Sequence, residues 1–422
     1  MRNPFDQYLN PENRLTHALL TCLSMDSRVL RRFVLWANCD APPAARLEVL
    51  EQSLPGRELD VSEEDAERRG LPDGCITDGA GWGLLIESKF AAAVSADQLC
   101  RHLRTAARHG LDKPILLLLT VGEVKQWLPA EVTVRRWSEV YSWLIRERSR
   151  SVWARLAAEY LEVAEARGVE QEYLQEGALT VFTGIPFRLK DPYTYSQAKR
   201  LLGLLLEELR KDKRLQRELG ADPESKGRGA ITGRTAQGVW DFISLKSSAR
   251  SQVFTRHPHL TVGIRDSRLE VYVTIPNGVA AHVRRGILGE SLEDFEALIG
   301  KVTGLLGAAL RRYPGATPMI VVVQRRYPTQ RSPAIIDANL RFDPRTAFPD
   351  SRRVARGVKL QPQWLSVTYG LLKNRQSNLQ FQIGADFSYE QCQVVATAGV
   401  REAAVEVWLA CKPLLEAVRG GA

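Results

Sequence analysis

The chain begins with apolar positions at helical spacing. Asn10 can cap a helix in which Leu15 and Leu19 fall on one face, and Asp26 can cap a second helix that ends near Ala37. Both segments have the apolar stripe that lets a helix pack against a sheet. We therefore expect the first 40 or so residues to contribute two helices to a packed core.

A hairpin, a helix and a buried strand are predicted next. Strands at 75–78 and 82–89 are separated by the glycine-bearing loop Gly79-Ala80-Gly81, which is typical of a hairpin. Ser95 can cap a helix over about 95–108. The run 114–121 is almost continuously apolar, as expected for a strand that is buried on both faces at the centre of a sheet.

A strand at 132–135 and helices at 138–148 and 153–166 complete the pattern of the first half. The order is helix, hairpin, helix, strand, strand, helix. Helices interleaved with strands in this way indicate the α/β class. We place this first domain at residues 1–170.

The second half also mixes strands and helices. A basic helical stretch at 195–218 precedes a polar segment at 221–229 with the composition of a linker, so residues 171–237 are predicted to connect two domains. Beyond it we predict helices at 291–312 and 401–418 and strands at about 240–245, 260–264, 269–275, 320–323, 365–369 and 379–383. The pattern partly recurs, so the second domain, 238–422, is predicted to be mixed α/β (α+β) and to consist of two related units.

Composition excludes several classes of protein. The longest apolar stretch, 115–121, is far shorter than the roughly 20 residues of a membrane-spanning helix. The first residues lack the apolar core of a secretory signal, so we expect a cytoplasmic protein with no membrane partner. The six cysteines are scattered without a CxxC pair, which favours small core residues over a zinc site or disulfides. His257 and His259 are interpreted as loop residues.

Charge is distributed unevenly between the two halves. Residues 1–185 carry 22 basic and 27 acidic side chains, a balance of −5, whereas residues 186–422 carry 36 and 22, a balance of +14. Arginine pairs such as Arg284-Arg285, Arg325-Arg326 and Arg352-Arg353 contribute to this excess. A basic half favours a polyanionic partner, although a charged, solvated surface explains the same residues equally well. No zinc finger, basic zipper or clear helix-turn-helix indicates sequence-specific DNA recognition.

Two acidic residues are predicted to face each other across the hairpin. If pairing is centred on Ala80, Asp73 lies opposite Glu87, at roughly 5 Å between Cβ atoms, where like charges destabilise a sheet unless a cation neutralises them. Lys89 lies two residues beyond Glu87 and therefore on the same face. A bulge at Gly81 would shift this register by one residue, in which case Asp78 could contact a metal instead.

This combination suits metal-dependent phosphodiester chemistry. Mg²⁺ prefers one or two protein carboxylates and keeps positions open for water and phosphate. A lysine beside it can orient the attacking water or neutralise charge on the phosphate in the transition state. Asp73, Glu87 and Lys89 are therefore candidate catalytic residues, with Mg²⁺ or Mn²⁺ as the cofactor.

The residues Pro72-Asp73-Gly74, followed after the hairpin by Glu87-Ser88-Lys89, resemble the PD-(D/E)xK motif of restriction-endonuclease-like nucleases. The resemblance covers about residues 8–145. It implies an αβββαβ core in which Asp73 and Glu87 bind metal and Lys89 assists catalysis. It also implies that Glu12 on the first helix lies near the metal and that Gln98, after the third strand, helps to line the catalytic site.

The resemblance further implies a nuclease, with DNA as the expected substrate and bacterial restriction or antiphage defence as a fitting role. A homodimer is expected because many such nucleases pair to cut both strands. Among the alternatives, Glu12 would be a helix-dipole residue, and Gln98 a surface residue of a first helical turn. His17 and His102 could approach the site from their helices, but the preferred interpretation of each is a solvated or core histidine.

Two further hypotheses concern the whole chain. The nuclease fold could be degenerate, leaving a nucleic-acid-binding or assembly subunit. Alternatively, the second domain could sense a small-molecule or protein activator and hold the nuclease inactive until the activator binds. No GxxxxGK[ST] loop indicates ATP-driven action.

Overall fold

The computed structural model describes residues 5, 8, 10–39, 46–55, 71–90, 93–124, 126–170, 179–185, 195–225, 227, 238–246, 254–329, 335–348, 359–373 and 378–420. The chain forms two compact units, Met1–Val181 and Phe182–Ala422, each with its own sheet. Both units mix helices with strands, in agreement with the predicted α/β class. No helix of the described residues is both long and apolar enough to cross a membrane.

The N-terminal unit contains a five-stranded sheet in the order β1-β2-β3-β4-β5. Its strands are β1 (Glu48–Glu51), β2 (Gly74–Thr77), β3 (Gly83–Lys89), β4 (Ile115–Thr120) and β5 (Val132–Arg136). The first three pair antiparallel, and β3, β4 and β5 pair parallel. The β2–β3 register joins Gly74 to Ile86 and Thr77 to Gly83, so the pairing is centred on Ala80 as predicted.

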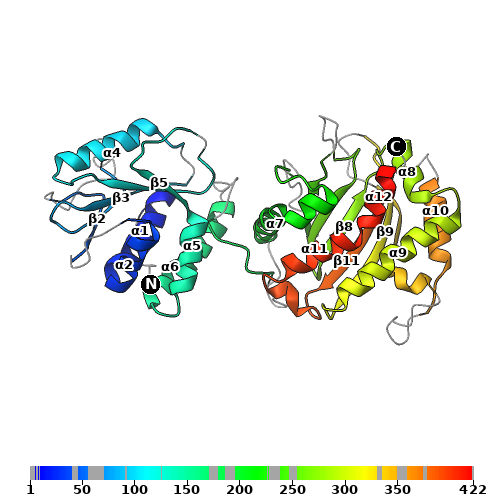
Figure 1. Ribbon diagram of the computed structural model, residues 1–422. Coiled ribbons are helices and arrows are strands. Elements are labelled where there is room, and N and C mark those ends of the chain that lie inside the picture. Colours follow the sequence, from blue (N-terminus) through cyan, green and yellow to red (C-terminus); the bar gives the residue numbers. More distant parts are fainter. Residues whose placement is uncertain are drawn as a thin grey trace. The chain divides into compact units, whose positions relative to one another are not determined.

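Helices cover both faces of this sheet (Figure 1). They are α1 (Pro11–Met25), α2 (Ser27–Trp36), α4 (Ala96–Arg108), α5 (Trp137–Glu147) and α6 (Val152–Glu170). Leu117 and Leu119 of β4 pack with α1, α2, α5 and α6, whereas Leu116 and Leu118 pack with Leu99 of α4. Because both faces are covered, β4 is apolar throughout, which explains its continuous run of leucines.

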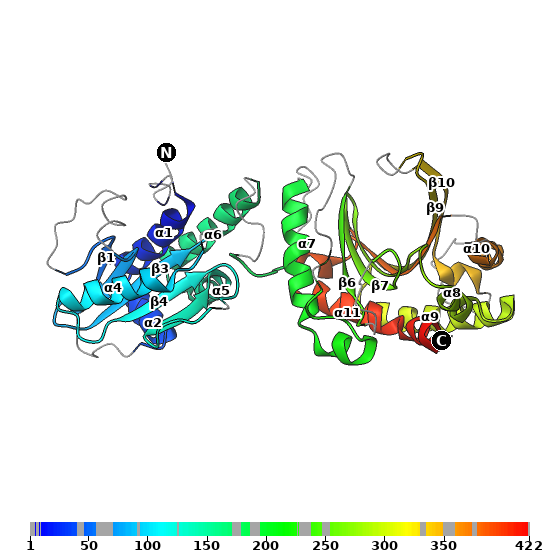
Figure 2. The same ribbon diagram turned by 90° about the horizontal axis from the view of Figure 1, so that it is seen from above.

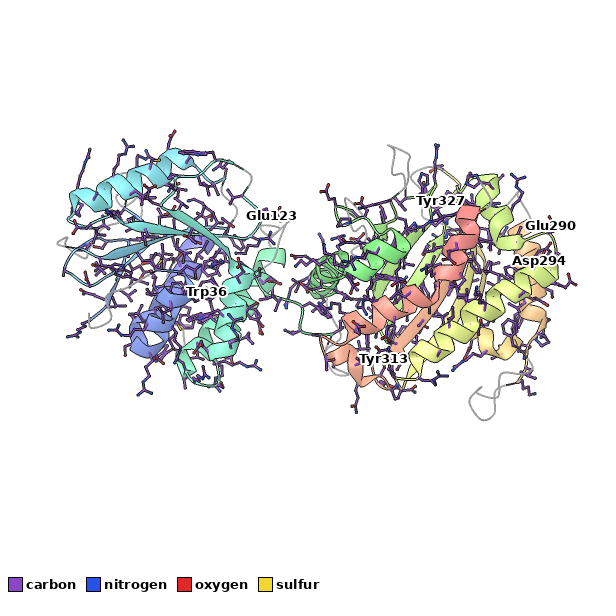
Figure 3. All side chains as sticks on the ribbon, viewed as in Figure 1. Trp36, Glu123, Glu290, Asp294, Tyr313 and Tyr327 are labelled. Atoms are coloured by element: carbon purple, nitrogen blue, oxygen red, sulfur yellow. The ribbon has the colours of Figure 1, made fainter. Side chains whose placement is uncertain are left out.

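The helices of this unit start and pack as their sequences require. The side chains of Asn10, Asp26 and Ser95 accept hydrogen bonds from the first-turn amides of α1, α2 and α4, which confirms the three predicted caps. At the end of α2, Trp36 (Figure 3) lies 5.5 Å from Phe33 and 5.9 Å from Trp143 between ring centroids. The contact between Trp36 and Trp143 joins α2 to α5.

The C-terminal unit contains one six-stranded antiparallel sheet in the order β10-β9-β11-β8-β7-β6. Its strands are β6 (Gly238–Ser244), β7 (His259–Arg265), β8 (Arg268–Ile275), β9 (Ala316–Arg326), β10 (Ile335–Phe342) and β11 (Leu379–Ser388). Its helices are α7 (Tyr195–Arg210), α8 (Ala281–Leu288), α9 (Leu292–Leu310), α10 (Gln363–Lys373), α11 (Val400–Ala410) and α12 (Lys412–Gly420).

Within the residues that the structure describes, helices pack on one face of this sheet. The sheet curves, with α9 and α11 on one side (Figure 2). Phe381, Ile383 and Ala385 of β11 are fully buried, whereas Gln380 and Gln382 between them are partly exposed and line a cleft on the opposite face. This alternation is typical of an antiparallel sheet with one packed and one open face.

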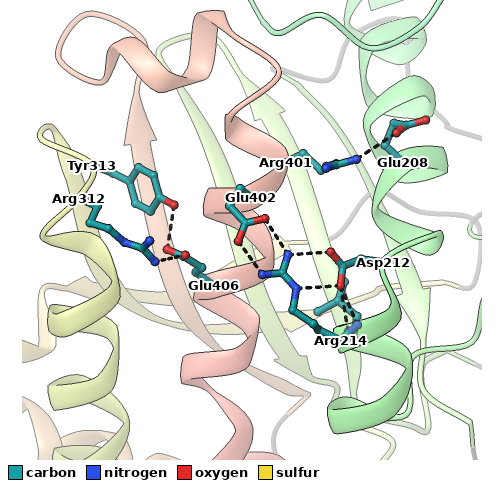
Figure 4. A network of polar contacts seen from close by, with 9 residues as sticks. Glu208, Asp212, Arg214, Arg312, Tyr313, Arg401, Glu402 and Glu406 are labelled. Atoms are coloured by element: carbon teal, nitrogen blue, oxygen red, sulfur yellow. Dashed lines mark hydrogen bonds and ion pairs between the residues drawn. The ribbon is translucent and has the colours of Figure 1, made fainter.

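Charged contacts fasten helices within the C-terminal unit (Figure 4). Arg214 donates two hydrogen bonds, of 2.6 and 2.7 Å, to Glu402 on α11. One turn further along α11, Glu406 accepts from the Tyr313 hydroxyl at 2.8 Å and pairs with Arg312. The acids of α11 therefore hold the segment after α7 on one side and the end of α9 on the other.

The boundary and the linker differ from the prediction. The division falls between Val181 and Phe182, and α7 packs against β6 and β7 instead of forming a separate connection. In the expected linker, Ser225 Oγ accepts from the Ser244 amide at 3.0 Å, because this segment runs beside β6. Residues 226 and 228–237 lie outside the described residues.

Three other expectations for the second half are wrong. The strands form one sheet and not two units, because β11 inserts between β8 and β9. Residues 365–369 are helical within α10, where Leu365, Thr368 and Leu372 are buried at helical spacing despite their β-favouring neighbours. His259 is the buried first residue of β7 and packs on Phe242, so it is not a loop residue. The strand β1 and the edge strand β10 were not predicted.

The cysteines are as predicted. All six are free, and all except the half-buried Cys100 are buried.

Candidate active site

The candidate site lies at the carboxyl end of β3. Glu87 and Lys89 pair with Leu118 and Thr120 of β4, so both residues stand at the end of the parallel part of the sheet. Leu85, which shares their face, packs in the core beneath α4. Strand alternation therefore aims Glu87 and Lys89 toward the α4 side of the sheet.

Asp73 is brought to the same place from the other strand of the hairpin. It directly precedes β2, where Gly74 pairs with Ile86, so continuing the register sets Asp73 opposite Glu87. Its Oδ2 atom accepts a hydrogen bond of 2.7 Å from the Ser88 amide. This contact fixes the carboxylate against the end of β3.

Three donor groups surround the Glu87 carboxylate, which is only 1% exposed as a residue. Its Oε1 atom lies 2.8 Å from Lys89 Nζ and accepts a 2.9 Å hydrogen bond from Nε2 of the Gln98 side chain. Its Oε2 atom lies 3.3 Å from His102 Nε2. Gln98 and His102 are four residues apart on α4, so they stand on one helical face.

Glu12 approaches from α1. Its Oε1 atom accepts a 2.8 Å hydrogen bond from the Phe90 amide, and its Oε2 atom lies 4.0 Å from Lys89 Nζ. The first turn of a helix suits an acidic residue in any case. The contact with the residue after Lys89, however, ties this carboxylate to the end of β3.

The ionisation of the two central carboxylates is coupled through their charges. Burial, together with repulsion from Glu87, raises the pKa of Asp73 to about 8. Burial alone would also raise the pKa of Glu87, but His102 and Lys89 hold that pKa below its ordinary value. Burial alone would lower the pKa of Lys89, but Glu87 raises it. Two buried carboxylates thus lie beside Lys89 and His102, and further positive charge near Asp73 would favour its ionised form at neutral pH.

The donor set fits a hard divalent cation. Within the described ranges, no group of three or more His, Cys, Asp or Glu side chains forms a ready metal cage. Mg²⁺ does not need one, because it is held by one or two carboxylates while water and phosphate oxygens complete its shell. Asp73 and Glu87 offer two carboxylates, and the raised pKa of Asp73 marks the shortage of positive charge there.

All five residues predicted for the site lie in this cluster. Sequence reasoning considered His102 for the site but favoured a solvated or core histidine, and the structure has it 2% exposed and facing Glu87. Its spacing of four residues from Gln98 was the available signal. Asp78 has a structural role, because its Oδ1 atom accepts from the Ala80 and Trp82 amides at 2.8 and 3.0 Å and closes the hairpin turn.

His17 does not join the site. It lies on α1, and its Nδ1 atom is 2.9 Å from both oxygens of Glu51 on β1. His17 therefore lies outside the cluster, whereas His102 is a buried histidine that also lies against Glu87.

Comparisons with models of known protein families, with curated proteins and with solved structures find no match to this chain.

Proposed function

We propose that the N-terminal unit is a metal-dependent nuclease of the PD-(D/E)xK type, which hydrolyses phosphodiester bonds. The order α1, α2, β1, β2, β3, α4, β4, β5 supports this proposal, since it contains the αβββαβ order that the resemblance implies, with α2 added after α1 and β5 added at the end. The antiparallel β1-β2-β3 part and the parallel β3-β4-β5 part of the sheet are compatible with the same core.

The observation that carries the proposal is the meeting of Asp73, Glu87 and Lys89 at one strand end, with Lys89 Nζ 2.8 Å from Glu87 Oε1. Burying two carboxylates in one cluster costs stability. Such a cost is typical of functional sites, where buried ionisable groups have shifted pKa values. An arrangement that served stability alone would match each buried acid with a cation.

In this proposal Asp73 and Glu87 hold Mg²⁺ or Mn²⁺, with Glu12 close by. When bound, such a cation polarises a phosphoryl oxygen and makes a bound water more acidic. Lys89 stabilises negative charge that develops on the phosphate and orients the attacking water. Gln98 and His102 contact the oxygens of Glu87 and keep its carboxylate oriented, as outer residues commonly do for metal ligands.

DNA is the proposed substrate on the strength of the resemblance. The basic C-terminal unit supports a nucleic-acid partner in general, because arginine contacts to phosphates supply affinity without reading sequence. A cytoplasmic role in restriction or antiphage defence is proposed on the same resemblance.

The test is cleavage of supercoiled and linear DNA by the full-length protein with Mg²⁺, Mn²⁺ or EDTA. Glu87→Gln keeps the side-chain shape and removes the charge. We expect it to lower the cleavage rate by about 10³-fold and to weaken Mn²⁺ binding, measured by calorimetry, at least about tenfold. Asp97→Asn is the matched control, since Asp97 is exposed on the same helix as Gln98 and lines no part of the cluster.

Each outcome has a clear meaning. Metal-dependent cleavage that Glu87→Gln loses and Asp97→Asn keeps would support the assignment. Equal cleavage by all three proteins would show that the site is elsewhere. Folded wild-type protein that binds no Mn²⁺ and cuts neither DNA nor RNA would contradict the proposal and favour a binding or assembly role.

A further inference from the structure

A cleft of about 360 Å³ lies on the open face of the sheet in the C-terminal unit. All six strands contribute to its lining, which includes four arginines: Arg265, Arg268, Arg325 and Arg341. The volume falls within the range of small-molecule sites, roughly 300–1,000 Å³. The candidate active site, in the other unit, contributes nothing to this cleft.

The floor of the cleft depends on two glycines. A Cβ atom at Gly384 would lie 2.0 Å from the Val271 carbonyl oxygen and 2.9 Å from the Tyr272 ring, so only glycine lets that ring lie down against β11. At Gly263 a Cβ atom would meet Glu270 at 3.4 Å and Trp240 at 3.5 Å. The absence of side chains at these two positions leaves room for Tyr272 and Glu270 on the floor.

Two buried carboxylates hold three of the arginines in place. Glu270 lies 2.8 Å from Arg265 and 2.9 Å from Arg268. Asp386 pairs with Arg341 and lies 3.4 Å from Arg268. Burial alone would raise the pKa of Glu270, but the arginines hold it below its ordinary value, so Glu270 is charged at neutral pH. These guanidinium groups are therefore fixed before any ligand arrives.

Arg325 differs from the other three. Among the described residues it has no carboxylate partner, and its guanidinium donates to the Gln380 side chain at 2.9 Å. Its Nε atom is enclosed and has no hydrogen-bond partner within the part of the chain that the structure describes. The uncompensated positive charge of the cleft is therefore located at Arg325.

The surroundings of Arg325 are suited to a polar organic group. Asn339 and Gln380 both pair with Val323, which is two residues from Arg325 on β9, so the two amide side chains flank this guanidinium along the sheet. Amide groups donate and accept hydrogen bonds, and arginine binds phosphate through paired N–H groups.

We propose that this cleft binds a small organic phosphate of mononucleotide size, with its phosphate on Arg325. The four lining arginines exceed the lining acids Asp266 and Glu270, together with Asp386, which pairs with Arg341, by one charge, which matches an anionic ligand. A nucleic-acid strand is typically bound in a positively charged groove that follows its backbone, whereas two carboxylates line this cleft. The mixed charges and the limited volume favour the small ligand, and this inference does not depend on the nuclease proposal.

The experiment is titration calorimetry of the full-length protein with AMP, GMP, CMP, UMP, ribose 5-phosphate, inorganic phosphate and a short single-stranded oligonucleotide at two salt concentrations. We expect at least one organic phosphate to bind saturably at one site per chain. Arg325→Gln should weaken that binding by about tenfold or more, because a charge-assisted hydrogen bond is lost. Arg326→Gln is the matched control, since Arg326 is the exposed neighbour, pairs with Asp337 and lies outside the cleft lining.

The outcomes separate the alternatives, and unchanged thermal unfolding would show that both variants are folded. Binding weakened by Arg325→Gln and kept by Arg326→Gln supports the proposal. Wild-type protein that binds none of the organic phosphates overturns it, as does equal weakening in both variants. Inorganic phosphate that binds as tightly as every organic phosphate overturns the ligand class. Binding restricted to oligonucleotides and steeply salt-dependent would indicate a strand instead.

Discussion

In the N-terminal unit helices cover both faces of the sheet, whereas in the C-terminal unit they cover one face and leave the other as a polar cleft. The two candidate sites follow from this difference. A sheet that is buried on both faces can present chemistry only at its strand ends, where Glu87 and Lys89 lie. A sheet with one open face can place side chains across its middle, as Tyr272 and Arg341 show.

The two sites also differ in which charge is in excess. Around Glu87 the carboxylates outnumber the cations, so the site favours a metal ion. Around Arg325 the cations outnumber the carboxylates, so the cleft favours an anion. In both places a mixed, buried network holds the groups in position, and the sign of the surplus indicates the ligand.

The largest effect should follow from breaking the packed face of the C-terminal sheet. Phe381→Ala should lower the free energy of unfolding of this unit by about 3–5 kcal/mol, because the ring is fully buried in the core. Gln382→Ala, on the next residue and the opposite face, should cost about 1 kcal/mol, the value of its hydrogen bond to Thr274. Urea unfolding followed by circular dichroism would measure both, and equal losses would contradict a one-sided sheet.

In the N-terminal unit, substitutions on the two faces of a strand should lower the unfolding free energy by similar amounts. Leu117→Ala and Leu118→Ala alter neighbouring residues of β4 that point to opposite faces, and each should cost about 2–5 kcal/mol because both are fully buried. Urea unfolding would again give the values. A loss below about 1 kcal/mol for either variant would mean that one face of β4 is not packed as described.

Lys89→Met should separate catalysis from metal binding at the strand end. We expect the cleavage rate to fall by about 10²–10³-fold, since charge stabilisation in the transition state is lost. Mn²⁺ affinity measured by calorimetry should be kept or increased, because Lys89 Nζ competes with a cation for Glu87 Oε1. Lys211→Met is the control, since Lys211 is the exposed residue that directly follows α7. Full activity of Lys89→Met would remove Lys89 from the proposed mechanism.

The open-face sheet should be sensitive to acid through His259. Burial lowers the pKa of His259 to about 4, compared with about 6.5 in the unfolded chain. The unfolded state therefore binds the proton first, and stability should fall as the pH drops from 6.5 to 4, by up to about 3 kcal/mol. His259→Gln should flatten this part of the curve of unfolding free energy against pH. A wild-type curve that is already flat there would show that His259 is not neutral in the fold.

The smallest effect is expected at the exposed network of α11. Glu402→Gln removes the negative charge and one of the two oxygens that accept from Arg214, but both side chains are more than 40% exposed, so solvent screening limits the loss to about 0.5–1 kcal/mol. The difference in unfolding free energy from the wild type should shrink further in 1 M salt. A loss above about 2 kcal/mol would mean that this contact is buried in solution.

The sequence predicted the hairpin and the core of the candidate site because both depend on local information. Gly79 and Gly81 adopt φ angles of 71° and 117°, which favour glycine, and the loop they form determines the register that sets Asp73 opposite Glu87. The contact between His102 and Glu87 depends in addition on how α4 lies over the sheet, which spacing alone does not determine.

Local sequence patterns could not predict the strand order of the C-terminal unit. The residues of β11 do not indicate that it lies between β8 and β9. The pairing of strands so distant in sequence depends on the packing of the whole unit. Similarly, β10 has mostly exposed residues and lacks the apolar alternation that identifies a strand. Residues 365–369 favour strand by type but form a helix because tertiary packing outweighs propensity.

The central place of β11 has a consequence for the order of folding during synthesis. The ribosome makes β11 after all the other strands of its sheet, so β8 and β9 must wait with unpaired edges until residues 379–388 emerge. The N-terminal unit can complete its sheet much earlier, since β5 ends at Arg136. A nascent chain stalled before β11 would therefore carry a finished first unit and an aggregation-prone remainder, which makes this interval the one in which chaperones matter most.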